Sequence, residues 1–275
     1  MVGELPGAAG TGGAGEVTGS LATRLGDRVL ASAEGLGDFV RLIGGTLRAL
    51  GRRRPPLAEL LWQMRLIGVR STAIVAVTAT FTGMVFSLQT AFALERFGAK
   101  PYVGGVLALA LLRELGPALA AVMFAGRVGA GITAELASMK VTEQVDAIRA
   151  MGADPLQKLV LPRVAAAVLS LPLLAVFADV LGIAGGMLVA ATQYGIPAHF
   201  FLRTVTYNST VEDLVSGIVK TFFFGAIIGW IGCYMGLGTR GGTVGVGRAT
   251  TRAVVSSSIA VLVADFFLTK VLLAL

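Results

Sequence analysis

The 275-residue chain is 55% hydrophobic and 14% charged, and its net charge is +7 at pH 7. A soluble domain carries about a quarter charged residues, so this composition excludes an ordinary soluble protein and indicates one whose solvent is lipid. The basic residues gather at the ends of apolar runs, which indicates membrane topology and argues against a nucleic-acid partner. We predict an all-α integral membrane protein with about five transmembrane helices.

Residues for enzyme chemistry are scarce. Cys233 is the only cysteine and His199 the only histidine. A lone cysteine inside an apolar run excludes disulfides and thiolate clusters within one chain. His199 has no HExxH-type companion. We therefore expect no catalytic residue, no metal site and no cofactor in this chain.

No cleavable signal peptide is predicted in the N-terminal region. Residues 1–20 are rich in Gly and Ala without a basic start or an apolar core, so we expect a disordered tail. Residues 21–51 alternate apolar side chains at helical spacing with arginines, which is typical of an amphipathic helix in the headgroup layer. The alternative is a soluble helix that faces a protein core. The apolar runs that follow in the sequence favour the interfacial helix over this alternative. Residues 52–56, Arg-Arg-Arg-Pro-Pro, end this helix, and a second short interfacial piece completes the region 21–70.

The rest of the chain, residues 71–275, has the pattern of a multi-span transmembrane domain. Its apolar runs predict spans at about 71–94, 102–126, 160–190, 214–237 and 253–274. The first contains no charge and, at about 1.5 Å per residue, can cross a hydrocarbon core about 30 Å thick. The run from Val164 to Leu202 is too long for one crossing, so we expect a loop around Gly195 and Pro197.

The basic residues outside these spans predict the orientation. Nine Lys and Arg precede Ser71, five lie in 127–163 and three in 240–252, against three on the other side. The positive-inside rule then predicts a cytoplasmic N-terminus, and five spans place the C-terminus on the opposite side of the membrane.

A glycine-rich turn at 241–248 invites comparison with a phosphate-binding loop. Gly242 and Gly247 have the Walker spacing, but Arg248 and Ala249 stand where Lys and Ser or Thr are required. We therefore expect a tight cytoplasmic turn and no nucleotide hydrolysis in this chain.

Charges inside the spans are informative because each costs several kcal/mol in hydrocarbon. Three are positive and three negative, so all can pair: Arg113, Glu114, Asp179, Lys220, Asp265 and Lys270. We predict a polar network of Arg113, Glu114, Lys220 and Asp265 that links the second, fourth and fifth spans. Whether these pairs act in a mechanism or only fix helix packing stays open.

The cytoplasmic segment 127–159 has a dense pattern of caps. Thr142 is suited to cap a short helix from Glu143 to Met151 that ends at Gly152, and Asp154-Pro155 is suited to begin the next helix. One face would carry Val145, Ile148 and Met151; the exposed residues would be Glu143, Gln144, Asp146 and Arg149. Such a helix can dock in a groove of a cytoplasmic partner. A plain surface loop is the alternative.

Several of these stretches resemble one family. They are Leu111-Leu112-Arg113-Glu114-Leu115-Gly116-Pro117, Ala125-Gly126-Arg127-Val128-Gly129, Ala134-Glu135-Leu136 to Gln144, Asp154-Pro155, Ala249-Thr250-Thr251-Arg252 with Val254-Val255, Asp265-Phe266 to Leu268-Thr269, and Phe81-Thr82-Gly83-Met84 to Gln89. Together they resemble the MlaE/YrbE permeases. The resemblance covers about residues 60–275 and leaves out the first 20.

The resemblance implies a homodimeric transmembrane core of an ABC transporter in the bacterial inner membrane. Its partners would be two cytoplasmic ATPase subunits, which bind ATP and Mg, and a periplasmic MCE-domain protein. The cargo would be phospholipids or related membrane lipids moved between the inner and outer membranes.

The resemblance also assigns residues. The coupling helix that contacts the ATPase would run from Glu135 through Met151, with these contact residues: Glu135, Met139, Lys140, Glu143, Gln144, Asp146 and Met151. The family's intramembrane charges match Arg113, Glu114, Lys220 and Asp265. Lipid would occupy a pocket between two protomers, lined by the first, second and fifth spans, with Met84, Val85, Leu88 and Gln89 as candidates.

Two other functions remain as alternatives. A secondary transporter would use the intramembrane acids as a proton relay, but five spans without a detectable inverted repeat speak against it. A membrane scaffold would use the charges for packing alone. Partnership with an ATPase separates the first alternative from a permease, and bound lipid separates the second.

Overall fold

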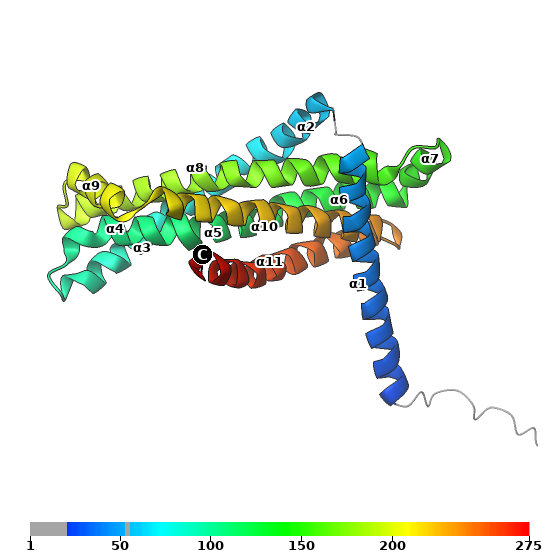
Figure 1. Ribbon diagram of the computed structural model, residues 1–275, viewed down its shortest axis with the longest axis horizontal. Coiled ribbons are helices and arrows are strands. Elements are labelled where there is room, and N and C mark those ends of the chain that lie inside the picture. The colour runs from blue at the N-terminus through cyan, green and yellow to red at the C-terminus, as the bar shows by residue number, and fades with distance from the viewer. Residues whose placement is uncertain (1–20, 53–55, 275) are drawn as a thin grey trace, which may run out of the picture. The chain divides into compact units, whose positions relative to one another are not determined.

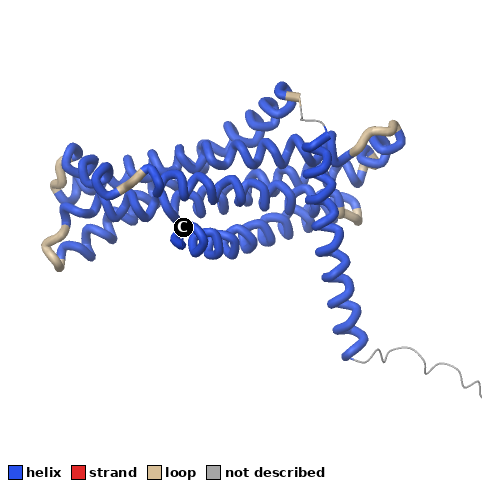
Figure 2. Tube along the Cα trace, viewed as in Figure 1, coloured by secondary structure: helices blue, strands red, loops and turns tan. Residues whose placement is uncertain are grey.

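The computed structural model describes residues 21–52 and 56–274. These residues are almost entirely helical and contain no strand (Figures 1 and 2), which confirms the predicted all-α class. The predicted disordered tail, 1–20, lies outside the described residues. The chain divides into two compact units after Arg41. Helix α1 (Leu21–Arg52) begins in the first unit, and everything below concerns the second, from Leu42 onward.

Five helical stretches are long and apolar enough to cross a membrane, as predicted. Several contain π-helical turns, labelled η. The first stretch, Leu57–Glu95, consists of α2 (Leu57–Met64), η1 (Arg65–Val69) and α3 (Arg70–Glu95). The second, Lys100–Val141, consists of η2 (Lys100–Tyr102, a 3-10 turn), α4 (Val103–Ala110), η3 (Leu111–Leu115), α5 (Gly116–Phe124), η4 (Ala125–Gly129) and α6 (Ala130–Val141). The third, Leu156–Tyr194, consists of η5 (Leu156–Val160) and α8 (Leu161–Tyr194), and the last two are the single helices α10 (Val211–Leu237) and α11 (Gly242–Ala274).

Two short helices join the long ones. Helix α7 (Gln144–Ala150) lies between the second and third long stretches, and α9 (Ala198–Asn208) between the third and fourth. Figure 1 shows them at opposite ends of the bundle formed by α3, α8 and α10. The two ends of the bundle are therefore marked by different connections.

The helices add detail to the predicted spans at two places. The helix that contains the predicted second span continues past residue 126 to Val141, because residues 127–141 contain no proline and the π-helical turn η4 carries the chain on without a break. The predicted loop around Gly195 and Pro197 is present, because residues 195–197 are not helical and Gly195 ends α8 with a φ of 64°. The short helix α9 that follows was not predicted. Helix α9 forms because Phe201 and Thr204 are buried against Gly104 of α4.

Close backbone contact holds α3 against α8. A Cβ added to Gly83 would overlap the carbonyl oxygen of Gly182, and one on Gly185 would overlap the carbonyl of Thr80. The Ser87 hydroxyl donates to the Gly186 carbonyl at 2.9 Å. Lipid supplies no hydrophobic drive between helices, so small residues that allow backbones to approach are what stabilise such a pair.

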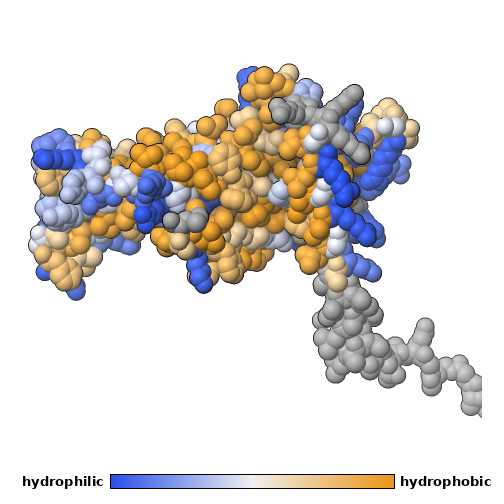
Figure 3. Space-filling model, in the orientation of Figure 1, coloured by the Kyte–Doolittle hydropathy of each residue, from blue (hydrophilic) through white to orange (hydrophobic). Residues whose placement is uncertain are grey.

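The outer surface is apolar along the middle and hydrophilic at the ends marked by α7 and α9 (Figure 3). Large apolar side chains are exposed there on α8 and α10, among them Leu173, Val180, Leu188 and Phe223. This is the arrangement expected of a bundle whose middle faces acyl chains.

Candidate functional site

Lys220 lies at the centre of a polar cluster formed by the second, fourth and fifth long helices. Its side chain is 1% exposed. The ammonium donates to Glu114 Oε1 at 2.8 Å, to the Arg113 carbonyl at 2.9 Å and to Thr269 Oγ1 at 2.6 Å. Asp265 Oδ1 is a further 3.4 Å ion-pair partner without a hydrogen bond. The reason is that an ammonium has three N–H donors and all three are engaged.

A proline explains why a backbone carbonyl belongs to this cluster. In an α-helix the carbonyl of Arg113 would accept from the N–H of residue 117, but Pro117 has no N–H. The π-helical turn η3 widens the backbone at the same place. The freed carbonyl points to Lys220, which donates to it. A proline four residues after Arg113 was therefore a sequence signal for this contact.

Thr269 is a cluster member that sequence reasoning missed. Its hydroxyl accepts from Lys220 and lies 3.2 Å from both Glu114 oxygens and 2.8 Å from the Asp265 carbonyl. It joins the positive and negative groups without a charge of its own. The available signal was its position four residues after Asp265, on the same face of α11.

The predicted network included the side chain of Arg113, but this side chain is not bonded to the other predicted members. Its guanidinium instead pairs with Asp213, which is 2% exposed at the start of α10. Asp213 also completes a capping box, accepting from the Thr210 N–H at 2.7 Å. Sequence reasoning missed Asp213 as well, although the Thr-x-x-Asp pattern before an apolar run was a signal for the cap.

The six intramembrane charges balance in sign, but within the described residues they do not all pair. Asp179 on α8 is buried, and its Oδ1 has no partner among the described residues because the carboxyl packs directly against the backbone at Gly116. Lys270 is exposed and forms no ion pair with any other described residue. Which charges pair depends on the direction in which each helix face points, and a count of positive and negative residues does not reveal this.

A cavity of about 110 Å³ opens beside the cluster. It is lined by Arg113, Glu114, Glu212, Asp213, Ser216, Lys220, Thr269, Leu272 and Leu273. Since a water occupies about 30 Å³ of liquid, the space accommodates a few waters. The side chains of Glu114 and Arg113 are 40% and 42% exposed. Charges this accessible inside a span need a hydrated or protein-covered space and not acyl chains.

The predicted coupling helix is two helices. Glu135, Met139 and Lys140 lie on α6, Gln144 and Asp146 lie on α7, and Met151 follows the end of α7. The chain turns at Glu143, which has a left-handed φ of 60°. We predicted that Thr142 caps the second helix, and this is wrong: its hydroxyl donates back to the Ser138 carbonyl at 2.9 Å.

Ion pairs hold this corner together. Lys140 Nζ lies 2.8 Å from Asp146 Oδ2, and Arg149 lies 3.4 Å from Asp146 Oδ1. The hydrogen bond from Lys140 lowers the pKa of the Asp146 carboxyl below its usual value. The stability from the Lys140–Asp146 contact is therefore present above the usual carboxyl pKa and is lost as pH falls through the lowered one.

The faces of α7 are partly as predicted. Val145 is buried in the core and Ile148 packs against it, but Met151 is 76% exposed and does not share their face. The reason is that the helix ends at Ala150, so Met151 departs from its register. Asp154 begins the next helix as predicted, accepting from the Leu156 N–H at 2.9 Å. Glu135 pairs with Arg163 at 3.2 Å.

The four lipid-pocket candidates lie on α3. Val85 and Leu88 are 54% and 42% exposed, Gln89 is exposed and Met84 is half-buried. None of the four lines a cavity described for this single chain. A pocket between two protomers needs a second copy, so this assignment stays a prediction.

Comparison with known proteins identifies the family. The family model described as Permease MlaE matches residues 60–271. The Probable ABC transporter permease protein of Rickettsia felis is 39% identical over 251 residues, which covers 91% of this chain and 97% of that protein.

Two further relatives extend the comparison. A Probable ABC transporter permease protein of Synechocystis is 45% identical over 208 residues, which covers 76% of this chain and 79% of that protein. The Intermembrane phospholipid transport system permease protein MlaE of Haemophilus influenzae is 37% identical over 249 residues, covering 90% and 95%. The resemblance drawn from the sequence motifs is thereby confirmed, and the chain belongs to the MlaE permease family.

Proposed function

We propose that this permease is the membrane-spanning subunit of an ABC transporter that moves phospholipids between the inner and outer membranes. The observation that carries the proposal is the 37% identity, along 90% of the chain, to a permease named for intermembrane phospholipid transport. The chain would lie in the inner membrane with its N-terminus in the cytoplasm. Two copies would assemble with cytoplasmic ATPase subunits, which bind ATP and Mg, and with a periplasmic MCE-domain protein.

The half-exposed charges support a space between two copies. Arg113 and Glu114 lie beyond the first several turns of the second long helix, yet more than a third of each side chain is exposed. Helix α11, which carries Asp265 and Thr269, buries only one narrow row of residues, namely Ala249, Ala253, Ser257 and Val261. A second protomer at this side would cover the charges and enclose the polar cavity.

The corner between α6 and α7 supports contact with an ATPase. It lies at one end of the bundle (Figure 1) and exposes polar, charged and apolar side chains, while Val145 anchors α7 to the core. A rigid, anchored corner can transmit a push from a partner to α6, which is continuous with the second span. ATP-driven closure of the ATPases would in this way change the space between the protomers.

The proposal is tested by purifying the tagged protein from native membranes in a gentle detergent, with mass spectrometry of proteins and lipids. We expect two copies of this chain, an ABC ATPase, an MCE-domain protein and a reproducible phospholipid. If the folded protein co-purifies with neither an ATPase nor a lipid, the proposal is contradicted and the alternative of a membrane scaffold is favoured.

The double variant Glu143→Gln/Asp146→Asn is expected to weaken ATPase association by about tenfold, the loss typical of removed interface charge pairs. It is measured as ATPase co-purification and as stimulated ATP hydrolysis. The matched control is Glu95→Gln/Lys100→Gln, which removes a 2.6 Å ion pair at the α9 end of the bundle. Equal ATPase association in both double variants would count against a coupling role for this corner.

A further inference from the structure

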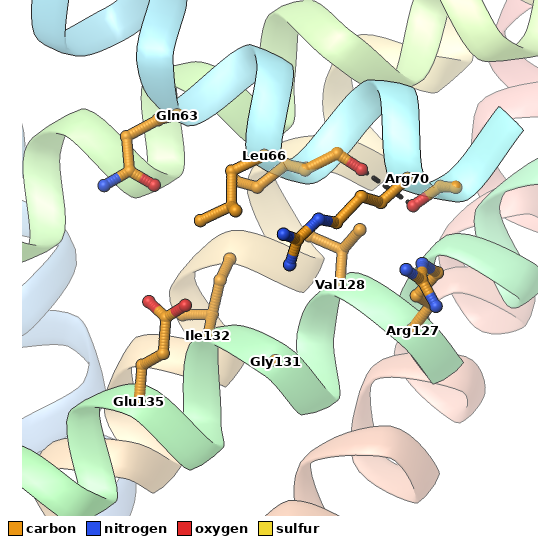
Figure 4. A pocket seen from close by; sticks show the side chains of 10 residues that line it. Gln63, Leu66, Arg70, Arg127, Val128, Gly131, Ile132 and Glu135 are labelled. Carbon is orange, nitrogen blue, oxygen red and sulfur yellow. Dashed lines mark hydrogen bonds between the residues drawn. The ribbon is translucent and has the colours of Figure 1, made fainter.

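A second cavity, of about 230 Å³, lies between the first two long helices near the α7 end of the bundle. It is lined by Gln63, Leu66, Ile67, Arg70, Ser71, Arg127, Val128, Gly131, Ile132 and Glu135. Figure 4 shows Arg70 extending from the first helix across this space toward the second, which carries Arg127 and Glu135. Two guanidinium groups from separate helices therefore share one cavity.

The charges of this cavity are not balanced by the protein. Glu135 is its only acidic lining residue, and Arg163, which lies outside the lining, pairs with it at 3.2 Å. Within residues 33–51 and 56–274, whose side chains the structure describes, neither Arg70 nor Arg127 has a side-chain hydrogen bond or ion pair. The Ser71 hydroxyl is already engaged, donating to the Ile67 carbonyl at 2.7 Å. The cavity thus presents two guanidinium groups that lack an anion.

The position along the first helix indicates where the anion comes from. Arg70 directly precedes the charge-free stretch Ser71–Leu94, so it lies where the hydrocarbon ends and the headgroup layer begins. Arg127 lines the same cavity and is therefore at the same level. The anion abundant in that layer is the lipid phosphate, and guanidinium binds phosphate through paired N–H donors.

The rest of the lining suits the remainder of a lipid. Leu66, Ile67, Val128 and Ile132 form an apolar wall, against which the glycerol and the first acyl carbons can pack. Gly131 lies in the lining, and a Cβ added to it would meet nothing within 4 Å, so the helix itself leaves this space open.

We propose that this cavity binds the phosphate of a phospholipid headgroup through Arg70 and Arg127. It is separate from the predicted cargo pocket, since Met84 is about 21 Å further along α3 at 1.5 Å per residue. The inference does not require the bound lipid to be the transported one. It holds or fails independently of the proposed transport function, which is tested through the ATPase and MCE partners.

The test is a titration of the purified full-length protein with dioleoylphosphatidylglycerol, followed by native mass spectrometry. We expect Arg70→Gln/Arg127→Gln to bind this lipid about tenfold or more weakly, as when charge-assisted hydrogen bonds are removed. Binding of dioleoylglycerol, which has no phosphate, should not change. Arg203→Gln, at an exposed arginine on α9, is the matched control and should bind like the wild type.

A second variant tests the cavity with both arginines intact. Gly131→Phe fills the open space without meeting other protein atoms at its Cβ, so it should weaken lipid binding while the thermal unfolding midpoint holds. Unchanged lipid binding in both this variant and the double arginine variant would overturn the proposal. Displacement of the lipid by equimolar inorganic phosphate would assign the site to free phosphate instead. Loss of ATPase co-purification with unchanged lipid binding would assign it to a protein partner.

Discussion

Lys220→Met is expected to lower the free energy of unfolding by about 3–5 kcal/mol, because it leaves the carboxylates of Glu114 and Asp265 without their buried cation. The Arg113 carbonyl, freed by Pro117, would also lose its donor. For a protein of this size the unfolding midpoint should fall by about 10 °C. The measurement is thermal unfolding of the purified protein in detergent.

The matched control is Lys270→Met. Lys270 is exposed in the same membrane region and has no ion pair among the described residues, so its removal should change stability by less than about 0.5 kcal/mol. Equal shifts in the two variants would contradict the central position of Lys220.

A neutral triple variant separates the two roles left open for this cluster. Lys220→Met with Glu114→Gln and Asp265→Asn removes the cation and both anions together, and such replacements restore much of the lost stability. If transport remains lost in the restored protein, the charges act in the mechanism. If transport returns, they serve packing alone.

Gly83→Val is expected to prevent α3 from reaching α8. A Cβ at this position overlaps the backbone carbonyl of Gly182, and a backbone group cannot rotate away as a side chain can. Overpacking against side chains costs about 1–3 kcal/mol, so a clash with backbone should exceed that range. We expect little monodisperse protein by fluorescence-detected gel filtration and a lower unfolding midpoint for what remains.

Gly126→Val is the control for this glycine. Position 126 is also helical and within a long span, but an added Cβ meets nothing within 4 Å. This variant should be recovered in wild-type yield. Poor recovery of both variants would show that valine in these helices, and not the contact with Gly182, is responsible.

The family and the span count could be predicted from the sequence because both depend on local information. Apolar runs of membrane-crossing length are properties of consecutive residues. Motifs such as Ala125–Gly129 are recognised in the same way. The rarity of charge in the spans also singled out Glu114, Lys220 and Asp265, since a buried charge in lipid needs a partner wherever that partner lies.

Other members of the site could not be assigned in this way. Asp213 and Thr269 are near the ends of apolar runs, where polar residues are ordinary, so composition did not mark them. The available signals were positional: the Thr-x-x-Asp pattern for Asp213 and the spacing of four residues from Asp265 for Thr269. The presence of α9 likewise depends on its contacts with Gly104, which helix propensity does not contain.

The sequence by itself thus determined which segments enter the membrane, which charges accompany them and which family they define. The tertiary structure decided which groups meet: Arg113 with Asp213, its carbonyl with Lys220, and Arg70 with Arg127 around one cavity. The physical reason is that a partner depends on the rotation and vertical register of two helices. Those are set by close backbone contacts such as Gly83 on Gly182, which involve residues far apart in the chain.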